Sequence, residues 1–418
     1  MSQEKEPLKQ DIVSSIFNRS VKKRLSSLFV HKGAKTAPAG AATLPSGTTI
    51  IKKKFPFGVD IGTNSIKIAQ LGFDREGGIK LIDLCVQELP EEARNPKERG
   101  QILAQSLKKM ADEKGLKGDC FAIMPHLSVK VNLIRLPQMP EAEIDKALRW
   151  EIRQTIQADI DEVSLDYIIL EGKKIKFLGN QTGILAVTTP KKDIFEHLAL
   201  LESAGLNPLA IDIEPLADLA VLDYIGKASA SEVVLFLDFG AGKTSLSVIC
   251  NNELVFIRYL NVTGNSLTKA ISEYCGIPWQ EAEETKKIFG LSASSTDEPR
   301  PSTQERGETA GGSSDKAIKV RNAILPLLEN MVQDIEHTFK YFSYQVTQSQ
   351  ITQFDRVILS GGSAYLKSLL PYLRNRLNKE VELITPLSSF GSLVQPVAGD
   401  DLGLRLNVAL GEALRGRD

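Results

Sequence analysis

The sequence predicts an α/β protein with two related domains. Strand-like and helical patterns alternate from about residue 55 to the C-terminus, which favours a mixed α/β class. The chain has 418 residues, enough for two or three domains. An apolar strand that ends in Asp-x-Gly, then a small-residue turn and a second strand, occurs in both FPFGVDIGTNSIKIAQL and VVLFLDFGAGKTSLSVI. This repeat, about 180 residues apart, predicts two related domains that face each other.

The expected strands and helices follow the hydrophobic pattern of the chain. Short apolar runs predict strands, and longer runs with apolar residues three and four apart predict helices. The expected strands are Phe57–Ile61, Ser65–Gly72, Ile79–Leu89, Cys120–Met124, Val129–Leu136, Leu165–Glu171, Thr182–Thr188, Ala210–Ile213, Val233–Phe239, Ser245–Cys250, Glu253–Tyr259 and Arg356–Ser360. The expected helices cover residues 97–113, 141–157, 191–204, 214–225, 264–274, 280–288, 316–347, 364–377 and 402–415.

The N-terminal residues differ in charge from the rest of the chain. Basic and acidic residues nearly cancel overall, 51 against 52, but residues 1–54 hold eleven basic and three acidic residues. Their net charge of +8 leaves −9 for residues 55–418. We expect a basic head in which residues 11–30 form an amphipathic helix, followed by a flexible tether over 33–50. Such helices bind anionic membrane surfaces and also dock on proteins, so both partners stay open.

The composition excludes several classes of protein. The overall charge balance excludes a generally basic nucleic-acid coat, and no nucleic-acid partner is expected. Four scattered cysteines without a CxxC pair indicate neither a disulfide framework nor a zinc site, which favours a reducing, cytoplasmic location. No apolar run approaches the ~18 residues that span a bilayer. Residues 291–316 hold almost no large apolar residue, and we expect a disordered insertion there.

The two Asp-x-Gly hairpins are candidate phosphate-binding loops. Small residues at a hairpin tip let a phosphate approach the backbone N–H groups. Two opposed loops would hold a polyphosphate from both sides, with Asp60 and Asp238 at a hydrated Mg²⁺. Either motif alone is also typical of an ordinary turn. The candidate binding residues are Asp60, Gly62, Thr63, Asn64, Ser65 and Lys67 in the first loop, and Asp238, Gly240, Ala241, Gly242 and Thr244 in the second.

Two further motifs follow in the second half of the chain. In RVILSGGSAYLKSLLPYL, a strand leads into Gly361, Gly362 and Ser363, and paired glycines let a flat ligand such as a purine lie against the backbone. In GIPWQEAEETKKIFG, Glu283 and Lys286 lie about one helical turn apart on the same side. The second pattern also fits a solvated ion pair. All five residues are candidate nucleotide contacts.

The order of these four motifs resembles that of the actin-like ATPase superfamily. The likeness covers roughly residues 55–418, and within it the chain is most similar to the PilM family of type IV pilus assembly, which is related to FtsA. The segments that carry this resemblance are VDIGTNSIKIAQL, VNLIRLPQMPEAEIDKALRWEIRQTI with the following LDYIIL, AGLNPLAIDIEPLADLAVL, LDFGAGKTSLSVICNNELVFIRYLNVTGNSLTKAI and LNVALGEALRG. One departure is Gly264-Asn265, where many relatives have two glycines.

The resemblance implies a ribonuclease H-like, two-domain actin fold with an FtsA/PilM-type extra subdomain of the SHS2 kind. The first core domain would comprise residues 55–118 and 191–228, and the extra subdomain residues 119–190. Residues 229–418, including the insertion, would form the second core domain. The LPQMPEAEIDKALRWE segment is the most specific sign of the extra subdomain.

The resemblance also implies a function. The chain would be an ATP- and Mg²⁺-binding scaffold, cytoplasmic and peripheral at the inner membrane, in type IV pilus or related type II secretion assembly. It would bind the cytoplasmic tail of a PilN-like inner-membrane protein, in a groove between the extra subdomain and the first core domain. Glu214, at the start of a helix in IDIEPLA, is the candidate catalytic residue that orients water, although an acid there also suits a helix N-terminus. We expect a slow ATPase at most.

Two alternative functions remain open from the sequence. One is an FtsA-like cell-division protein that polymerises at the membrane. The other is a sugar or acetate kinase of the same fold, which would need a catalytic Asp in a recognisable phosphoacceptor motif. The available acids, Asp83, Asp112, Asp119 and Asp166, lie in no such motif. A homo-oligomer is compatible with each of these functions.

Overall fold

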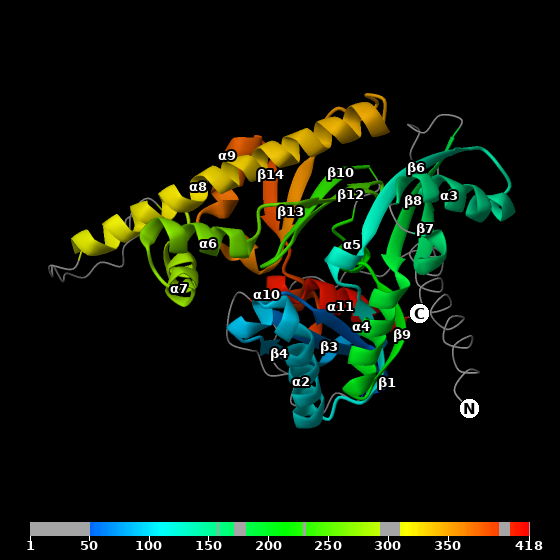
Figure 1. Cartoon of the computed structure of the whole chain (residues 1–418), viewed down its shortest axis with the longest axis horizontal. Coiled ribbons are helices and arrows are strands. Elements are labelled where there is room, and N and C mark those ends of the chain that lie inside the picture. Colours follow the sequence, from blue (N-terminus) through cyan, green and yellow to red (C-terminus); the bar gives the residue numbers. More distant parts are fainter. Residues whose placement is uncertain are drawn as a thin grey trace. The chain divides into compact units, whose positions relative to one another are not determined.

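The computed structural model describes residues 51–156, 159–170, 181–228, 231–292, 310–392 and 402–417 (Figure 1). They form two compact units. Unit 1 contains the described residues up to 228, together with 385–392 and 406–417, and unit 2 contains those from 231 to 384 together with 402–405. The expected head helix 11–30, the tether 33–50 and most of the insertion 291–316 lie outside the described residues.

Unit 1 is built on a seven-stranded sheet with the order β15-β4-β3-β2-β5-β9, in which β1 also pairs with β3. The strands β2, β3 and β4 are antiparallel neighbours, whereas β5 runs parallel to both β2 and β9. The strands are β1 (Ile51–Lys54), β2 (Phe57–Ile61), β3 (Ser65–Asp74), β4 (Ile79–Glu88), β5 (Gly118–Ile123), β9 (Leu206–Asp212) and β15 (Gly391–Ser392). Because β1 pairs with β3, residues 51–54 belong to this sheet rather than to the expected head.

One face of this sheet carries the main core of unit 1. The helices α2 (Pro96–Lys114) and α4 (Lys191–Ser203) contribute buried apolar side chains to a cluster that includes Phe57 and Val59 of β2. Side chains alternate along a strand, so positions 58 and 60, occupied by Gly58 and Asp60, face the side of the sheet opposite to Phe57 and Val59. The first Asp-x-Gly motif therefore starts on the face away from this cluster.

The opposite face is covered by the helix α11 (Asn407–Leu414), which packs on β2 and against α5 (Glu214–Tyr224). The helix approaches closely at Gly58, where a Cβ atom would lie 2.0 Å from the Ala409 carbonyl oxygen. All eight residues of α11 are buried. Their burial in unit 1 corrects the expected assignment of the whole of 229–418 to the second domain.

A separate three-stranded antiparallel sheet lies within unit 1, in the order β6-β8-β7. It comprises β6 (Lys130–Pro137), β7 (Val163–Leu170) and β8 (Gln181–Pro190) and is accompanied by α3 (Glu141–Thr155). Ile144, Leu148 and Ile152 of α3 are buried in its core, as their helical spacing predicts. The expected start of this subdomain at residue 119 is too early, because β5 belongs to the seven-stranded sheet.

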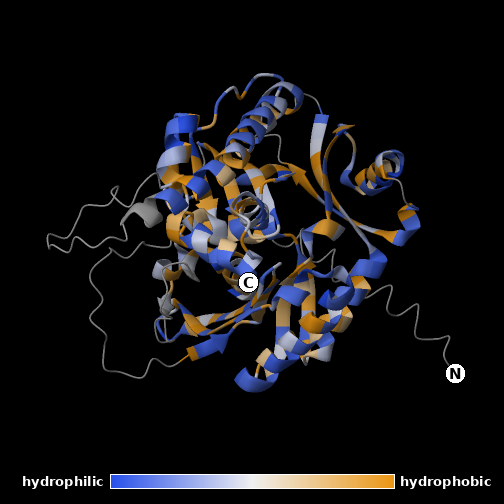
Figure 2. Ribbon diagram, turned by 60° about the vertical axis from the view of Figure 1, so that its left-hand side comes forward, coloured by the Kyte–Doolittle hydropathy of each residue, from blue (hydrophilic) through white to orange (hydrophobic). Residues whose placement is uncertain are grey.

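Unit 2 is built on a five-stranded sheet with the order β12-β11-β10-β13-β14. The strands β10, β11 and β12 are antiparallel neighbours, whereas β13 runs parallel to β10 and to β14. Hydrophobic residues gather in the sheets, and β11 is buried along its full length (Figure 2). The strands are β10 (Val233–Phe239), β11 (Thr244–Cys250), β12 (Glu253–Leu260), β13 (Arg356–Ser360) and β14 (Glu380–Leu383).

The helices of unit 2 include α8 (Ala310–Tyr341), the long helix in Figure 1, which contacts α6 and α7. Because α8 begins at Ala310, the last residues of the expected insertion 291–316 are helical. The other helices are α6 (Gly264–Cys275), α7 (Trp279–Phe289), α9 (Leu369–Leu377) and α10 (Leu402–Arg405). A π-helical turn at Phe342–Val346 follows α8.

Short 3₁₀ turns connect several of these elements. They are η1 (Glu91–Arg94), η2 (His126–Ser128), η3 (Ile160–Glu162), η6 (Gly362–Tyr365), η7 (Pro386–Ser389) and η8 (Arg415–Arg417). None of the helices in the described part of the chain combines the length and apolarity that a membrane span requires.

Candidate functional site

The first Asp-x-Gly hairpin joins β2 to β3 in unit 1. The Gly62 N–H donates to the Ser65 carbonyl at 3.0 Å and closes the turn. Asp60 and Lys67 are partners across the two strands, and Lys67 Nζ lies 2.7 Å from Asp60 Oδ2. Both side chains are largely buried. Lys67, predicted from the sequence to add charge for a phosphate, thus neutralises the Asp60 carboxylate in this structure.

The tip of the first loop comprises Gly62, Thr63 and Asn64, which are half-buried. The Asn64 carbonyl accepts a hydrogen bond from the Leu89 N–H at 2.8 Å, at the end of β4. Ser65 is buried as the first residue of β3. The loop is therefore held in place by its hydrogen bond to Leu89 and by the burial of Ser65.

The second hairpin joins β10 to β11 in unit 2 and is attached to the N-terminus of α6. The Gly240 carbonyl accepts from the Gly264 N–H at 3.0 Å, and the Ala241 carbonyl accepts from the Asn265 N–H at 2.7 Å. In a trans peptide the N–H of the next residue points away from the carbonyl. The N–H groups of Ala241 and Gly242 therefore face away from α6, an arrangement suited to binding an anion.

The Gly-Gly loop after β13 lies against the second hairpin. Gly361 has a φ of 86°, and a Cβ atom there would lie 2.3 Å from Asp238 Oδ1. Only glycine fits this position, because both the dihedral angle and the space exclude a side chain. Gly362 opens η6, and the Ser363 hydroxyl donates to the Gly240 carbonyl at 3.2 Å. The structure thus brings two motifs together that are separated by about 120 residues.

Gly264 and Thr244 make close contacts with residues next to the second hairpin. A Cβ atom at Gly264 would lie 2.2 Å from Ser363 Oγ and 3.2 Å from Ala241 Cα, so a side chain there would disturb the contact between the loops. Thr244 is fully buried, and its hydroxyl donates to the Val262 carbonyl at 2.6 Å. Its predicted contact with a phosphate stays a prediction.

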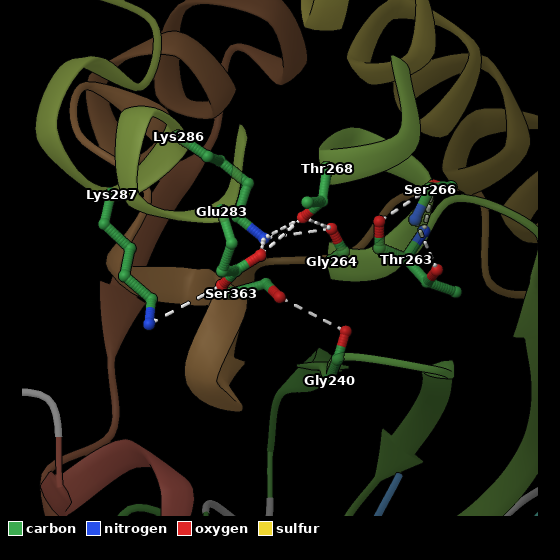
Figure 3. A network of polar contacts seen from close by, with 9 residues as sticks. All are labelled: Gly240, Thr263, Gly264, Ser266, Thr268, Glu283, Lys286, Lys287 and Ser363. Carbon is green, nitrogen blue, oxygen red and sulfur yellow. Dashed lines mark hydrogen bonds and ion pairs between the residues drawn. The ribbon is translucent and has the colours of Figure 1, made fainter. Parts of the chain in front are cut away.

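Lys286 of α7, which is buried, and Glu283, which is half-buried, form a network of polar contacts with α6 (Figure 3). Lys286 Nζ donates to the Gly264 carbonyl at 3.0 Å and to Thr268 Oγ1 and Glu283 Oε2 at 2.7 Å each. Burial raises the pKa of Glu283, but the charge of Lys286 and the hydrogen bonds from Lys286 and Thr268 outweigh it and hold the pKa below its usual value. The pair therefore has a buried lysine and a half-buried glutamate, and it differs from a fully solvated surface pair.

Glu214, the candidate catalytic residue, is the first residue of α5 and is buried in unit 1. Asp218 lies one turn further along the same helix and is also buried, and its Oδ1 accepts a hydrogen bond from Asn407 Nδ2 at 2.5 Å. Neither Asp218 nor Asn407 is among the candidate site residues predicted from the sequence. Two acids four residues apart in the otherwise apolar segment EPLADLAVL were the available signal.

The residues present fit a nucleotide and its metal ion. Each unit presents one buried carboxylate at the start of a small-residue loop, Asp60 in unit 1 and Asp238 in unit 2. Carboxylate oxygens are the hard ligands that Mg²⁺ prefers, and loops with outward N–H groups suit phosphate. In unit 2 the structure brings the hairpin, the α6 N-terminus and the Gly-Gly loop into mutual contact.

Two α/β units, each with an Asp-x-Gly hairpin, are typical of the actin-like fold. A solved structure described as "PilM-PilN type IV pilus biogenesis complex" has the same fold, with a TM-score of 0.70 and 24% identity. The similarity covers 87% of this chain and 98% of that one. It confirms the predicted fold. The sequence profile of the type IV pilus assembly protein PilM matches residues 58–298, more than half of the chain, and the chain therefore belongs to this family.

FtsA proteins are also similar to this chain. The profile of the cell division protein FtsA matches residues 235–398. The FtsA of Streptococcus pneumoniae is 20% identical over 362 residues, which cover 80% of this chain and 76% of that protein. The FtsA of Bacillus subtilis is 26% identical over 202 residues, 48% of this chain and 44% of that protein. Because their identity is low, these FtsA proteins support the FtsA-like alternative less strongly than the PilM profile supports membership of the PilM family.

Proposed function

We propose that this chain is an ATP-binding scaffold of type IV pilus or related type II secretion assembly, which holds the cytoplasmic tail of a PilN-like inner-membrane protein. Membership of the PilM family carries the proposal. The likeness to the PilM–PilN structure over 87% of the chain supports the same partner. The protein would work at the cytoplasmic face of the inner membrane, peripheral to it.

The proposed cofactors are ATP and Mg²⁺. The two hairpins bind the phosphates, Asp60 and Asp238 hold the Mg²⁺ ion, and the ion offsets the phosphate charge. Glu283 and the loop of Gly361, Gly362 and Ser363 contact the nucleoside. Lys286 contributes by fixing Glu283 against α6, since its ammonium group donates to Glu283, to the Thr268 hydroxyl and to the Gly264 carbonyl. Glu214 orients water, and hydrolysis is slow at most.

The extra subdomain supports the proposed site for the tail of the partner. It exposes two large apolar residues to solvent. Leu127 in η2 is 88% exposed and Trp150 in α3 is 64% exposed. Tryptophan is among the residues that most often carry the binding energy of a protein interface. An apolar tail would bury both side chains and add backbone hydrogen bonds.

The variants Leu127→Ser and Trp150→Ala should each weaken binding of the partner's tail peptide. We expect about a tenfold loss of affinity for the double variant, because burial of such side chains contributes much of the energy at an interface. Fluorescence anisotropy with a labelled tail peptide measures the loss. MgATP binding should stay as in the wild-type chain.

The matched control is Tyr274→Ala in unit 2, which removes an aromatic side chain of similar exposure, 58%. It should bind the tail as tightly as the wild-type chain. If the double variant also binds the tail normally, the site lies elsewhere on the protein. Deletion of the subdomain is a poorer test, because it removes the buried core that Leu148 and Ile152 form.

An FtsA-like division protein is the second candidate function, favoured by the FtsA profile over residues 235–398. The two functions differ in the partner that co-purifies with the chain. A PilN-like protein with a single membrane span supports the scaffold, whereas a division protein supports the alternative. Contact of residues 11–30 with anionic membranes and the formation of a homo-oligomer stay predictions.

A further inference from the structure

Arg99, in the first turn of α2, holds the tip of the first phosphate loop from behind. Its Nη2 donates to the Gly62 carbonyl at 2.9 Å, and its Nη1 donates to the carbonyls of Thr63 and Ala93 at 3.1 Å each. The helix begins after Asn95, whose side chain accepts the Lys97 N–H as an N-cap. The cap fixes the start of α2, and with it the position from which Arg99 reaches the loop.

Among the described residues, the partners of the Arg99 guanidinium are uncharged. In the part of the chain that the structure describes, its contacts are the three carbonyl oxygens, and it forms no ion pair. Burial lowers the pKa of Arg99, but an arginine remains protonated at neutral pH. Lys67, the cation predicted for this loop from the sequence, is by contrast paired with Asp60.

The contacts with Arg99 set the direction of two peptide groups. The Gly62 and Thr63 carbonyls point to the guanidinium, so the N–H groups of Thr63 and Asn64 face the other way. A cation at the carbonyl end polarises a peptide and strengthens the positive end at its N–H. Both N–H groups thus become better donors to an anion on the far side of the loop.

The second loop has the same arrangement with a different donor. In DIGT and DFGA, Gly62 and Thr63 correspond to Gly240 and Ala241. The carbonyls of Gly240 and Ala241 accept from the N–H groups of Gly264 and Asn265 at the N-terminus of α6. A helix N-terminus carries a partial positive charge, and the guanidinium supplies a full one at the equivalent place.

We propose that Arg99 is a positioning residue that presents the first loop to the phosphates of the nucleotide and supplies positive charge through two peptide groups. This inference rests on the proposed ATP site. Arg99 itself stays behind the loop and contacts no phosphate. Its removal should therefore weaken phosphate binding while the Asp60–Lys67 pair remains intact.

The variants Arg99→Gln and Arg99→Lys test the proposal by calorimetry with MgATP. We expect Arg99→Gln to bind MgATP about tenfold more weakly. Arg99→Lys should fall between Arg99→Gln and the wild-type chain, because lysine keeps the charge but cannot donate in a fork to two carbonyls. The matched control is Arg94→Gln, which removes the same charge from an exposed ion pair with Glu91 and should bind MgATP normally.

A chemical rescue separates positioning from a merely structural role. Millimolar guanidinium chloride should restore part of the MgATP affinity of Arg99→Ala, whereas sodium chloride at the same concentration should not. Normal affinity in Arg99→Gln overturns the inference. The inference is also overturned if guanidinium does not restore the MgATP affinity of Arg99→Ala and Arg99→Lys has a lower melting temperature than the wild-type chain. Failure of the wild-type chain to bind MgATP overturns the proposed nucleotide site and this inference with it.

Discussion

Asp238→Ala should bind MgATP at least about a hundredfold more weakly than the wild-type chain, with a much smaller effect on ATP in the presence of a chelator. Asp238 is the second-last residue of β10 and is 5% exposed. The backbone at Gly361 approaches its carboxylate so closely that no side chain fits there. The proposed metal contact therefore occupies a position at which the loops of unit 2 converge.

Isothermal titration calorimetry with and without Mg²⁺ measures this difference. Asp238→Asn is the isosteric variant, and it should show nearly the full loss because it removes the charge and keeps the shape. Glu273→Ala, which removes an exposed acid from α6, should bind as the wild-type chain does. Equal MgATP affinity in Asp238→Ala and the wild-type chain would show that the second phosphate loop is wrongly assigned.

The local parts of the fold were predictable from the sequence. The strand β2 with Asp60 and the strand β10 with Asp238 appear as apolar runs that end in a turn signal. The helix α3 follows from the spacing of Ile144, Leu148 and Ile152. These elements are determined by residues close together in the chain, so a periodic pattern is sufficient to find them.

The contacts between distant residues were not predictable in this way. Arg99 lies 37 residues from Gly62, and Asn407 lies 189 residues from Asp218. Neither pair leaves a periodic signal, since a helix or strand pattern reports only which face is apolar. The position of α11 in unit 1 likewise depends on the fit of small residues such as Gly58 and Gly411 against a neighbouring backbone. Such a fit is visible only once the chain is folded.

The spacing of Glu283 and Lys286 in the sequence does not reveal how deeply the pair is buried. The sequence predicts that they face the same side of a helix, and in the structure they form an ion pair at 2.7 Å. The alternative from the sequence was a solvated surface pair of little energy. The Lys286 side chain is only 9% exposed, however, and it also links α7 to the Gly264 carbonyl at the start of α6.

Lys286→Met should lower the free energy of unfolding of unit 2 by about 1–2 kcal/mol at neutral pH, because it leaves the half-buried Glu283 carboxylate without its nearest cation. Urea unfolding followed by circular dichroism measures the loss. The double variant Lys286→Met/Glu283→Gln should recover much of it, since no uncompensated charge then remains. Lys287→Met is the matched control, because Lys287 is exposed and lies 3.7 Å from Glu283.

The pH dependence of the same variants gives a second, independent test of the ion pair. In the wild-type chain the pKa of Glu283 is lowered, so its stabilising contribution is present above the usual value of 4.5 and is lost as the pH falls through the lower, folded value. In Lys286→Met burial remains and the main cation is gone, so the pKa should rise above 4.5 and the protonated form should be favoured. The stability difference between the two proteins should therefore be largest at neutral pH and shrink as the pH falls toward about 4. A stability difference that is independent of pH would instead make Lys286 a packing residue. A Lys286→Met protein of wild-type stability that no longer binds MgATP would make Lys286 a direct contact of the nucleotide.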